Sequence, residues 1–272
     1  MDDFLEANRE LWDHWTGEHE ASPFYDLAGF KKGKDRLRSI ELSELGDVAG
    51  KSLLHLQCHF GMDTLAWSRR GAIVTGADLS PRSIALARSL NEELRLPATF
   101  ICADVYDLPD RLTAEFDFVF TSYGVLHWLS DLPKWAGIVA RFLKPGGVFY
   151  IVDDHPFFRA LSTNESRELL VRNPYFYSKT PDRVEMSGSY ATEAAGEKRT
   201  FFIWNHPLGE VIGSILEAGL TIEHLHEFPF AARAKYPFME QGDDGWWRLP
   251  ESYLPIPFLF SLRAHKPGPP SS

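Results

Sequence analysis

Acidic side chains follow two successive apolar runs in the first half of the chain. Asp78 follows a run that ends at Ala77, and Asp104 follows a run that ends at Cys102. A carboxylate in the first position can accept hydrogen bonds from both hydroxyls of a ribose. One in the second can accept a bond from an exocyclic amine such as adenine N6. Either residue alone is common after a strand, but the ordered pair indicates a site for a nucleoside-type ligand.

A polar junction precedes these acids, and it reads His55-Leu56-Gln57-Cys58-His59-Phe60-Gly61. Backbone N–H groups point outward where a strand passes into a helix, and nucleotide-type ligands bind there. Asp78 follows Gln57 by 21 residues, a spacing typical of a ribose-binding acid. A dinucleotide also needs the pattern G-x-G-x-x-G, because small residues let the backbone approach a pyrophosphate. That pattern is missing, which disfavours a nicotinamide-dependent oxidoreductase on this architecture.

An alternation of strands and helices is expected to position these groups. Short apolar runs predict buried strands at Ser52–Cys58, Ala72–Ala77, Ala98–Cys102, Phe116–Thr121 and Val148–Val152. Helical patterns lie between them at Asp63–Arg70, Ser80–Leu94 and Leu132–Leu143. Such units form a parallel sheet covered on both faces, which binds ligands at the carboxyl ends of its strands. The predicted fold class is therefore α/β, doubly wound and mostly parallel.

The rest of the chain is expected to elaborate this core within one domain. We predict an N-terminal cap at 1–35 with a helix at 2–15, a core at 36–154, an inserted lid at 155–206, completion of the core at 207–266 with an insertion at 229–257, and a tail at 267–272. Within the lid, Val184–Tyr190 and Arg199–Trp204 read as short strands. A helix at Leu208–Ala218 and strands at Leu220–Phe228 and Phe258–Ala264 follow.

Five segments together resemble the class I S-adenosylmethionine-dependent methyltransferases. They are Leu53–Gly61, Thr75–Ser80, Ala103–Val105, Phe116–Val119 and Leu143–Gly147. The resemblance implies a seven-stranded Rossmann-like sheet with an antiparallel strand at one edge. The last two predicted strands would form this edge. The chain departs from the family in its first motif, which usually has an acidic residue followed by three alternating glycines. Here those positions hold His55, Gln57, His59 and Gly61.

The same resemblance implies S-adenosylmethionine as cofactor and assigns its contacts. The methionyl part would border Gln57, Cys58, His59 and Gly61, the ribose would bind Asp78, the adenine would contact Leu79, Asp104 and Val105, and the sulfonium would lie above Thr121 and Ser122. The altered first motif leaves a second interpretation open, in which the chain is a binding module that has lost its cofactor.

Methyl transfer is an in-line displacement, so the protein mostly aligns the acceptor and excludes water. A general base is needed only where the acceptor must lose a proton. The acceptor should lie above the fourth and fifth strands, where His155 is the first candidate base, oriented by Asp153 or Asp154. Tyr123 and His127 are the next candidates, and a satisfied loop residue is the alternative interpretation of each histidine.

Metal ligation is a third role open to the histidines. His127, His155 and His206 could form such a site, but they lack a close helical pair and a matching carboxylate. We therefore predict no metal.

Aromatic residues make up 14% of the chain and gather in the expected cap segments. Those predicted to contact a substrate are Trp12, Trp15, Tyr25, Tyr190, Trp204 and Trp246. Aromatic side chains there would close a dry pocket over a small acceptor, and their faces would suit a sulfonium cation. The alternative interpretation is that they only attach the cap to the sheet.

Charge and composition limit the classes of partner that the protein is expected to bind. The 272 residues carry a net charge of −10, which disfavours nucleic acid and anionic membranes as partners. The first residues, Met1–Phe4, are acidic where a signal peptide would be basic, and no apolar run is long enough to span a bilayer. We expect a cytoplasmic enzyme with a small-molecule substrate, and the oligomeric state stays open.

The two cysteines, Cys58 and Cys102, test the strand order that the family implies. In that order the first and third strands flank the second, so their backbones lie ~9–10 Å apart. This exceeds the ~7 Å limit for a disulfide. We therefore predict two free thiols.

Overall fold

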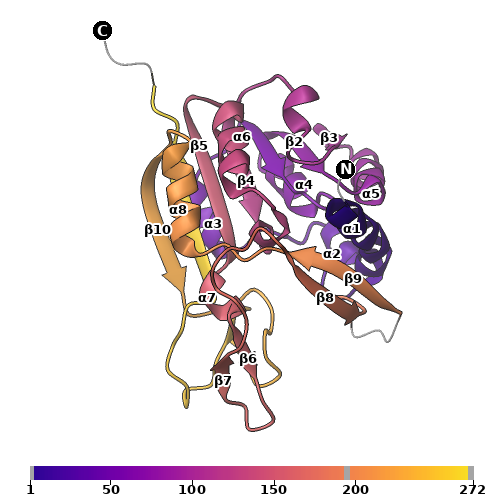
Figure 1. Cartoon of the computed structure of the whole chain (residues 1–272). Helices are drawn as coiled ribbons and strands as arrows, with labels where there is room; N and C mark the ends of the chain where they lie inside the picture. The colour runs from indigo at the N-terminus through magenta and orange to yellow at the C-terminus, as the bar shows by residue number, and fades with distance from the viewer. Residues whose placement is uncertain (1–2, 193–196, 269–272) are drawn as a thin grey trace.

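A seven-stranded sheet forms the centre of the computed structural model, which describes residues 3–192 and 197–268. Its spatial order is β10-β13-β5-β4-β1-β2-β3 (Figure 1). The strands are β1 Ser52–Leu56, β2 Ile73–Asp78, β3 Ala98–Cys102, β4 Phe116–Ser122, β5 Leu143–Asp154, β10 Thr221–Phe228 and β13 Leu259–His265. β1 to β5 pair in parallel, and β13 runs antiparallel to both β5 and β10. The predicted doubly wound, mostly parallel fold is confirmed.

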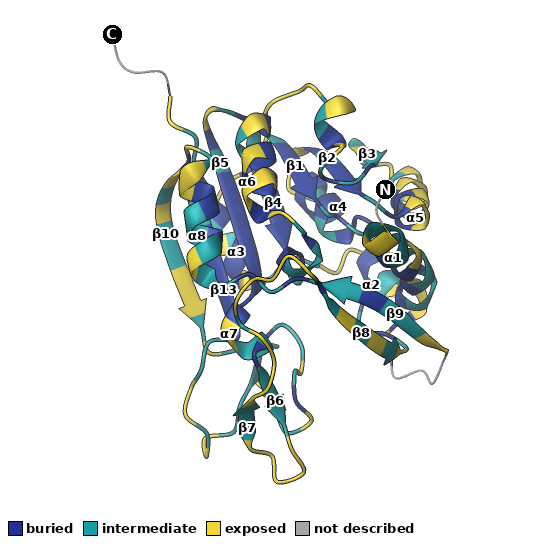
Figure 2. Ribbon diagram, viewed as in Figure 1, coloured by how far each residue is buried: buried dark blue, intermediate teal, exposed yellow. Residues whose placement is uncertain are grey.

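Helices cover both faces of this sheet (Figure 1). One face carries α6 Leu132–Phe142 and α8 Leu208–Glu217, and the other carries α3 Ser39–Leu45, α4 Met62–Arg69 and α5 Pro81–Leu94. α5 begins where Ser80 accepts a hydrogen bond from the Ser83 backbone N–H at 3.0 Å, an N-cap that satisfies a free amide. The central strands are buried on both sides, as Figure 2 shows in dark blue, which is why they read as continuous apolar runs.

The first helix is longer than the sequence pattern predicts. α1 spans Asp3–Ala21 and runs through Gly17, a residue type that often interrupts helices. The exposed Arg82 guanidinium, from the first turn of α5, lies directly over Gly17, so α1 passes close to the start of α5 here. Two further helices, α2 at Leu27–Lys31 and α3, are not predicted from the sequence, because both are too short for a clear helical period.

The predicted lid is an irregular insertion that ends in a hairpin. It contains α7 Pro156–Arg159, β6 Leu161–Thr163, β7 Leu169–Val171, β8 Asp182–Ser187 and β9 Lys198–Ile203. β8 and β9 pair antiparallel, in agreement with the two strand-like runs of the sequence. The Asn8 side chain of α1 donates to the Phe202 carbonyl at 2.8 Å and accepts from the Phe202 N–H at 2.9 Å. The hairpin and α1 therefore lie side by side (Figure 1).

The remaining segments are short. Two 3-10 turns lie at Leu108–Asp110 and Leu126–Trp128, and the 229–257 insertion contains β11 Glu240–Gln241 paired with β12 Trp247–Arg248. Among the described helices, none combines the length and the apolar character needed to cross a bilayer. The predicted tail at 267–272 lies outside the described residues from 269 onward.

Both cysteines are free thiols, as predicted. β2 lies between β1 and β3 and pairs with each of them. The strand order that the family resemblance implied is therefore confirmed at this edge of the sheet.

His55 gives a test of how burial in β1 affects stability. Its ring is buried and hydrogen-bonded to Thr64 Oγ1 at 2.8 Å, and burial lowers its pKa to about 3. Below the unfolded-state pKa of about 6.5, the unfolded chain takes up a proton that the native state refuses, so stability falls as pH falls. Relative to a His55→Gln variant, the native protein should lose about 2 kcal/mol of unfolding free energy between pH 7 and pH 5.

Urea unfolding of both proteins at the two pH values measures this difference. A His14→Gln variant on the half-exposed surface of α1 serves as the control, because the bond of the His14 ring within the described part of the chain is to Glu18 of the same helix. A His55→Gln effect that is the same at both pH values would show that the imidazole is not held neutral.

Candidate active site

Two cavities open at the carboxyl ends of the strands. The first, here called the cap cavity, has a volume of about 440 Å³ and is covered by α1 and the β8–β9 hairpin. The second, here called the β3 cavity, has a volume of about 480 Å³ and extends to the residues that follow β3. Both are lined by Trp12, Gln57, Asp78, Leu79 and Trp128. The two cavities are therefore neighbours that share a wall.

The junction after β1 keeps the backbone of a glycine-rich loop without most of its glycines. Gln57, His59 and Gly61 have φ of 56°, 52° and 77°, respectively. Each non-glycine residue in this left-handed region costs roughly 1–2 kcal/mol. At Gly61 a Cβ would also lie 2.6 Å from the Phe100 ring, which explains why this glycine is kept. The departure from the family motif is therefore in the side chains rather than in the path of the chain.

The His59 side chain ties the junction to the helices above it. One ring nitrogen is hydrogen-bonded to His19 of α1 at 2.9 Å, and the other to Ser83 of α5 at 2.9 Å. Burial, together with the neighbouring His19, lowers the pKa of His59 well below its usual range. One partner comes from α1 of the cap and the other from α5 of the core, so this neutral ring connects α1 to the core beside the junction.

Asp78 at the end of β2 lines both cavities. Its two carboxylate oxygens accept backbone N–H bonds from His59 at 2.7 Å and Ser80 at 2.9 Å. Burial raises the pKa of this carboxyl to about 6. Each oxygen keeps a further lone pair, so Asp78 can still accept hydrogen bonds from a ligand.

The other predicted nucleoside contacts meet in the β3 cavity. Asp104 and Val105 line it beside Leu79. Asp104 accepts a hydrogen bond from the Tyr106 N–H at 3.2 Å, and burial raises the pKa of its carboxyl. An acid and two apolar side chains thus face one space of nucleoside size.

Gln57 leaves an acceptor without a partner between the two cavities. Its Nε2 donates to the Val125 carbonyl at 3.3 Å, whereas its buried Oε1 accepts from no described residue. A buried polar atom without a partner costs ~1–3 kcal/mol, and a ligand N–H would remove that cost.

The structure separates two of the predicted sulfonium contacts. Ser122 lines the cap cavity, where its hydroxyl donates to Asp63 at 3.3 Å. Thr121 is fully buried and donates to the Leu56 carbonyl at 3.1 Å, so it lines neither cavity. Consecutive side chains of a strand point to opposite faces, which is why only one of the two can face the ligand. Cys58 also lines the cap cavity, where burial raises the pKa of its thiol.

His155 does not lie where a base is predicted. It caps α7, accepting a hydrogen bond from the Phe157 N–H at 3.0 Å, and its Nε2 lies 2.8 Å from a Glu227 carboxylate oxygen. It lines neither cavity, and neither Asp153 nor Asp154 bonds to it. The turn at Pro156 directs the ring away from the strand ends, so the structure removes His155 from the candidate bases.

Tyr123 and His127 both line the cap cavity. The Tyr123 hydroxyl donates to Glu41 at 2.7 Å, and burial raises the pKa of this hydroxyl well above its usual range. Burial, aided by the charges of Arg159 and Lys235, lowers the pKa of His127 well below its usual range. His127 is therefore neutral at neutral pH and can accept a hydrogen bond, but its lowered pKa makes it a weak base. The Tyr123 hydroxyl already donates its proton to Glu41.

Asp153 holds the turn that carries these two residues. Its buried carboxylate accepts backbone N–H bonds from Gly124, from Val125 at 3.2 Å and from Leu126 at 2.9 Å. Burial, together with the adjacent Asp154, raises the pKa of Asp153. Its role in the structure is to shape the turn after β4, and it does not orient His155.

Four of the six predicted substrate-contacting aromatic residues line the cap cavity. They are Trp12, Trp15, Tyr25 and Tyr190. The Tyr25 and Tyr190 hydroxyls are hydrogen-bonded at 2.5 Å, and the Trp12 and Trp128 ring centroids lie 5.2 Å apart.

The other two lie elsewhere. Trp204 lines the β3 cavity, and Trp246 lines neither cavity because it is buried with its Nε1 donating to Ser39 at 3.3 Å. Several polar and aromatic residues line the cap cavity without being predicted from the sequence, namely Arg36, Trp128, Arg159, Phe201, Arg233 and Lys235. Nothing in their local spacing marks them, because they come from segments far apart in the chain.

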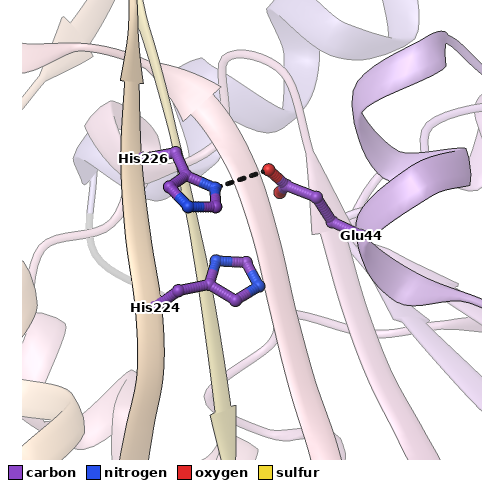
Figure 3. Close-up of side chains that lie close together, drawn as sticks. All are labelled: Glu44, His224 and His226. Atoms are coloured by element: carbon purple, nitrogen blue, oxygen red, sulfur yellow. Dashed lines mark hydrogen bonds and ion pairs between the residues drawn. The ribbon is translucent and has the colours of Figure 1, made fainter.

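A cluster of potential metal ligands lies apart from both cavities. Glu44 of α3 faces His224 and His226, which point the same way from β10 (Figure 3). Among the described residues, this is the group whose ligand atoms could surround an ion, all of them within 4.8 Å of one another. His226 Nδ1 is hydrogen-bonded to Glu44 at 2.8 Å, and the Tyr150 hydroxyl donates to the other Glu44 oxygen at 2.8 Å. The carboxylate is therefore already engaged on both oxygens.

The three histidines considered from sequence do not gather. His206 is hydrogen-bonded to the Leu129 carbonyl at 2.8 Å and lies 3.1 Å from Glu210, whereas His155 caps α7.

Taken together, the sheet order and the paired cavities define a protein of the doubly wound nucleotide-binding class. The family described as "Methyltransferase domain" matches residues 54–151. An uncharacterised methyltransferase of Synechocystis sp. is 35% identical over 126 residues, which are 45% of this chain and 56% of that protein. The ubiquinone biosynthesis O-methyltransferase of Pseudomonas aeruginosa is 26% identical, covering 71% of this chain and 81% of that protein.

Solved structures share the same fold. A methyltransferase from Mesorhizobium loti has a TM-score of 0.58 at 21% identity over 82% of this chain and 94% of that one. One from Listeria monocytogenes has a TM-score of 0.57 at 18% identity with the same coverage, 82% and 94%. Residues 54–151 form a methyltransferase domain, and these comparisons support the class I S-adenosylmethionine-dependent methyltransferases as the family of this chain. The resemblance seen in the sequence is confirmed, and the oxidoreductase alternative is not supported.

Proposed function

We propose that this enzyme transfers a methyl group from S-adenosylmethionine to a small-molecule acceptor bound in the cap cavity. The observation that carries the proposal is the pair of adjoining cavities of about 440 and 480 Å³ at the carboxyl ends of the strands. A cofactor that extends from the β3 cavity to the β1 junction would leave the rest of the cap cavity for the acceptor. The volumes suit two small molecules side by side.

The residues of the β3 cavity and the junction fit the cofactor. Asp78 would accept hydrogen bonds from the ribose hydroxyls, and Asp104 would accept one from the adenine amine. The unpartnered Oε1 of Gln57 would accept a hydrogen bond from the ammonium of the methionyl part. Arg36, 3.4 Å from Asp63 at the start of α4, would face its carboxylate. When bound, the cofactor supplies an electrophilic methyl group on a sulfonium.

The cap cavity suits the other half of the reaction. Its aromatic walls would exclude water from the reacting atoms of the cofactor and the acceptor, which must stay aligned for the transfer. Where the acceptor nucleophile must lose a proton, His127 would accept a hydrogen bond from it, because the imidazole is neutral and no described residue bonds to its ring nitrogens. The name of the Pseudomonas relative, a ubiquinone biosynthesis O-methyltransferase, also supports a small-molecule acceptor.

Calorimetric titration with S-adenosylhomocysteine tests the proposal. We expect micromolar binding at one site per chain, because the acid and apolar contacts are already in place. Methyl transfer to a panel of small hydroxylated and aminated acceptors should then be detectable. A folded protein that binds no S-adenosylhomocysteine would favour the binding module that has lost its cofactor. Tight binding of NAD in its place would favour an oxidoreductase.

A further inference from the structure

One wall of the cap cavity concentrates positive charge in an acidic protein. Arg159 of α7 lines this wall together with Arg233 and Lys235, which come after β10 in the chain. The chain as a whole carries a net charge of −10. Basic side chains on the inside of such a molecule point to an anionic ligand rather than to general solubility.

The acids that line the cavity are all partnered. Asp154 is paired with Lys235 Nζ at 2.6 Å, and both side chains are buried. Asp63 lies 3.4 Å from Arg36 and accepts a hydrogen bond from Ser122. Asp78 accepts two backbone N–H bonds. The cavity therefore offers little free negative charge to a cationic acceptor.

Two arginines on the same wall have no acidic partner among the described residues. Within residues 3–192 and 197–268, no carboxylate lies within ion-pair distance of Arg159 or Arg233. The Nε of Arg159 is buried and donates to no described acceptor. The Arg233 guanidinium lies 5.1 Å from the centroid of the Tyr190 ring. A buried guanidinium without an anion is costly, so a ligand that brought one would be bound strongly.

We propose that the methyl acceptor is a small molecule in which a carboxylate group is attached to an aromatic or apolar body, and that Arg159 and Arg233 bind this carboxylate group. This inference rests on the proposed function and names its substrate class. The planar fork of a guanidinium matches a carboxylate with two parallel hydrogen bonds. The charges of Asp153 and Asp154 both act on Arg159 and offset part of the positive charge of this wall, which favours a monoanion over a dianion such as a phosphate monoester. The apolar body would pack on the rings of Trp15, Tyr190 and Phe201, which line the same cavity.

The cofactor does not need these arginines for its own carboxylate. Arg36 lies beside Asp63, at the start of the helix after the β1 junction where the methionyl part would lie. Arg159, Arg233 and Lys235 are instead near enough to His127 for their charges to lower its pKa. The acceptor anion and the candidate base would thus share one end of the cavity.

Ligand-observed NMR titration of the protein saturated with S-adenosylhomocysteine tests the inference. The probes are benzoate, the neutral isostere benzamide and the dianion phenyl phosphate. We expect benzoate to bind at least about tenfold more tightly than benzamide or phenyl phosphate, because hydrogen bonds between charged groups supply a difference of this size. Arg159→Met and Arg233→Met should each remove this preference while S-adenosylhomocysteine affinity stays within about twofold. An Arg172→Met variant on the exposed surface should behave like the native protein.

The outcomes separate this inference from the proposed function. Equal binding of benzoate and benzamide, tighter binding of phenyl phosphate, or an unchanged preference in both arginine variants would overturn the carboxylate assignment alone. Failure of the native protein to bind S-adenosylhomocysteine would overturn the proposed function and this inference with it.

Discussion

An Asp78→Ala variant should bind S-adenosylhomocysteine about 10- to 150-fold more weakly than the native enzyme. The proposed ribose contacts are hydrogen bonds to a charged group, worth about 1.5–3 kcal/mol. Calorimetric titration measures the change. Asp110→Ala is the matched control, because Asp110 is exposed in the loop after β3 and lines neither cavity. A dissociation constant like that of the control would show that the ribose lies elsewhere.

The same carboxylate also shapes the junction, so binding must be separated from folding. Asp78→Ala leaves the His59 and Ser80 N–H groups without their acceptor. Asp78→Asn keeps one acceptor oxygen, and thermal unfolding identifies variants that remain folded. Burial raises the pKa of Asp78 to about 6, so protonation competes with the cofactor below that pH. Affinity should fall about tenfold by pH 5 in the native enzyme, and Asp78→Asn should flatten this dependence.

An Asp153→Ala variant should lose about 3–5 kcal/mol of unfolding free energy. The carboxylate accepts N–H bonds from Gly124, Val125 and Leu126, and alanine would leave these buried amides without partners. Methyl transfer should be lost as well, because this turn positions Tyr123 and His127. Urea unfolding gives the free energy, and an unchanged m-value would show that the unfolded state is unaffected.

A second aspartate gives the control for this prediction. The Asp131 carboxylate also accepts a backbone N–H bond, at the start of α6. It accepts a single exposed one, from Lys134 at 2.9 Å. Asp131→Ala should therefore cost only about 1 kcal/mol. A loss for Asp153→Ala no larger than this would mean that the turn after β4 keeps its shape without the carboxylate.

The sequence alone determined the sheet and which of the residues proposed to bind the cofactor lie at the strand ends. Continuous apolar runs separated by helical patterns predict buried parallel strands, because only residues covered on both faces lack polar alternation. A residue directly after such a strand must lie at its carboxyl end, whatever the rest of the chain does. Asp78 and Asp104 therefore lie at strand ends and line the cavities there, and the relation of Cys58 to Cys102 resulted from the same strand order.

The tertiary structure alone decided which side chains line the cavity proposed for the acceptor. Side chains beyond a strand end are directed by local turns and by distant packing partners, which have no period in the sequence. His155 is held outside both cavities by its contacts with Phe157 and Glu227, whereas Asp153 holds the turn that carries His127 at the cap cavity. Arg159 and Arg233, 74 positions apart in the chain, meet at one cavity wall only after folding. Sequence spacing determines which residues lie at a strand end, but long-range packing decides which side chains face a cavity.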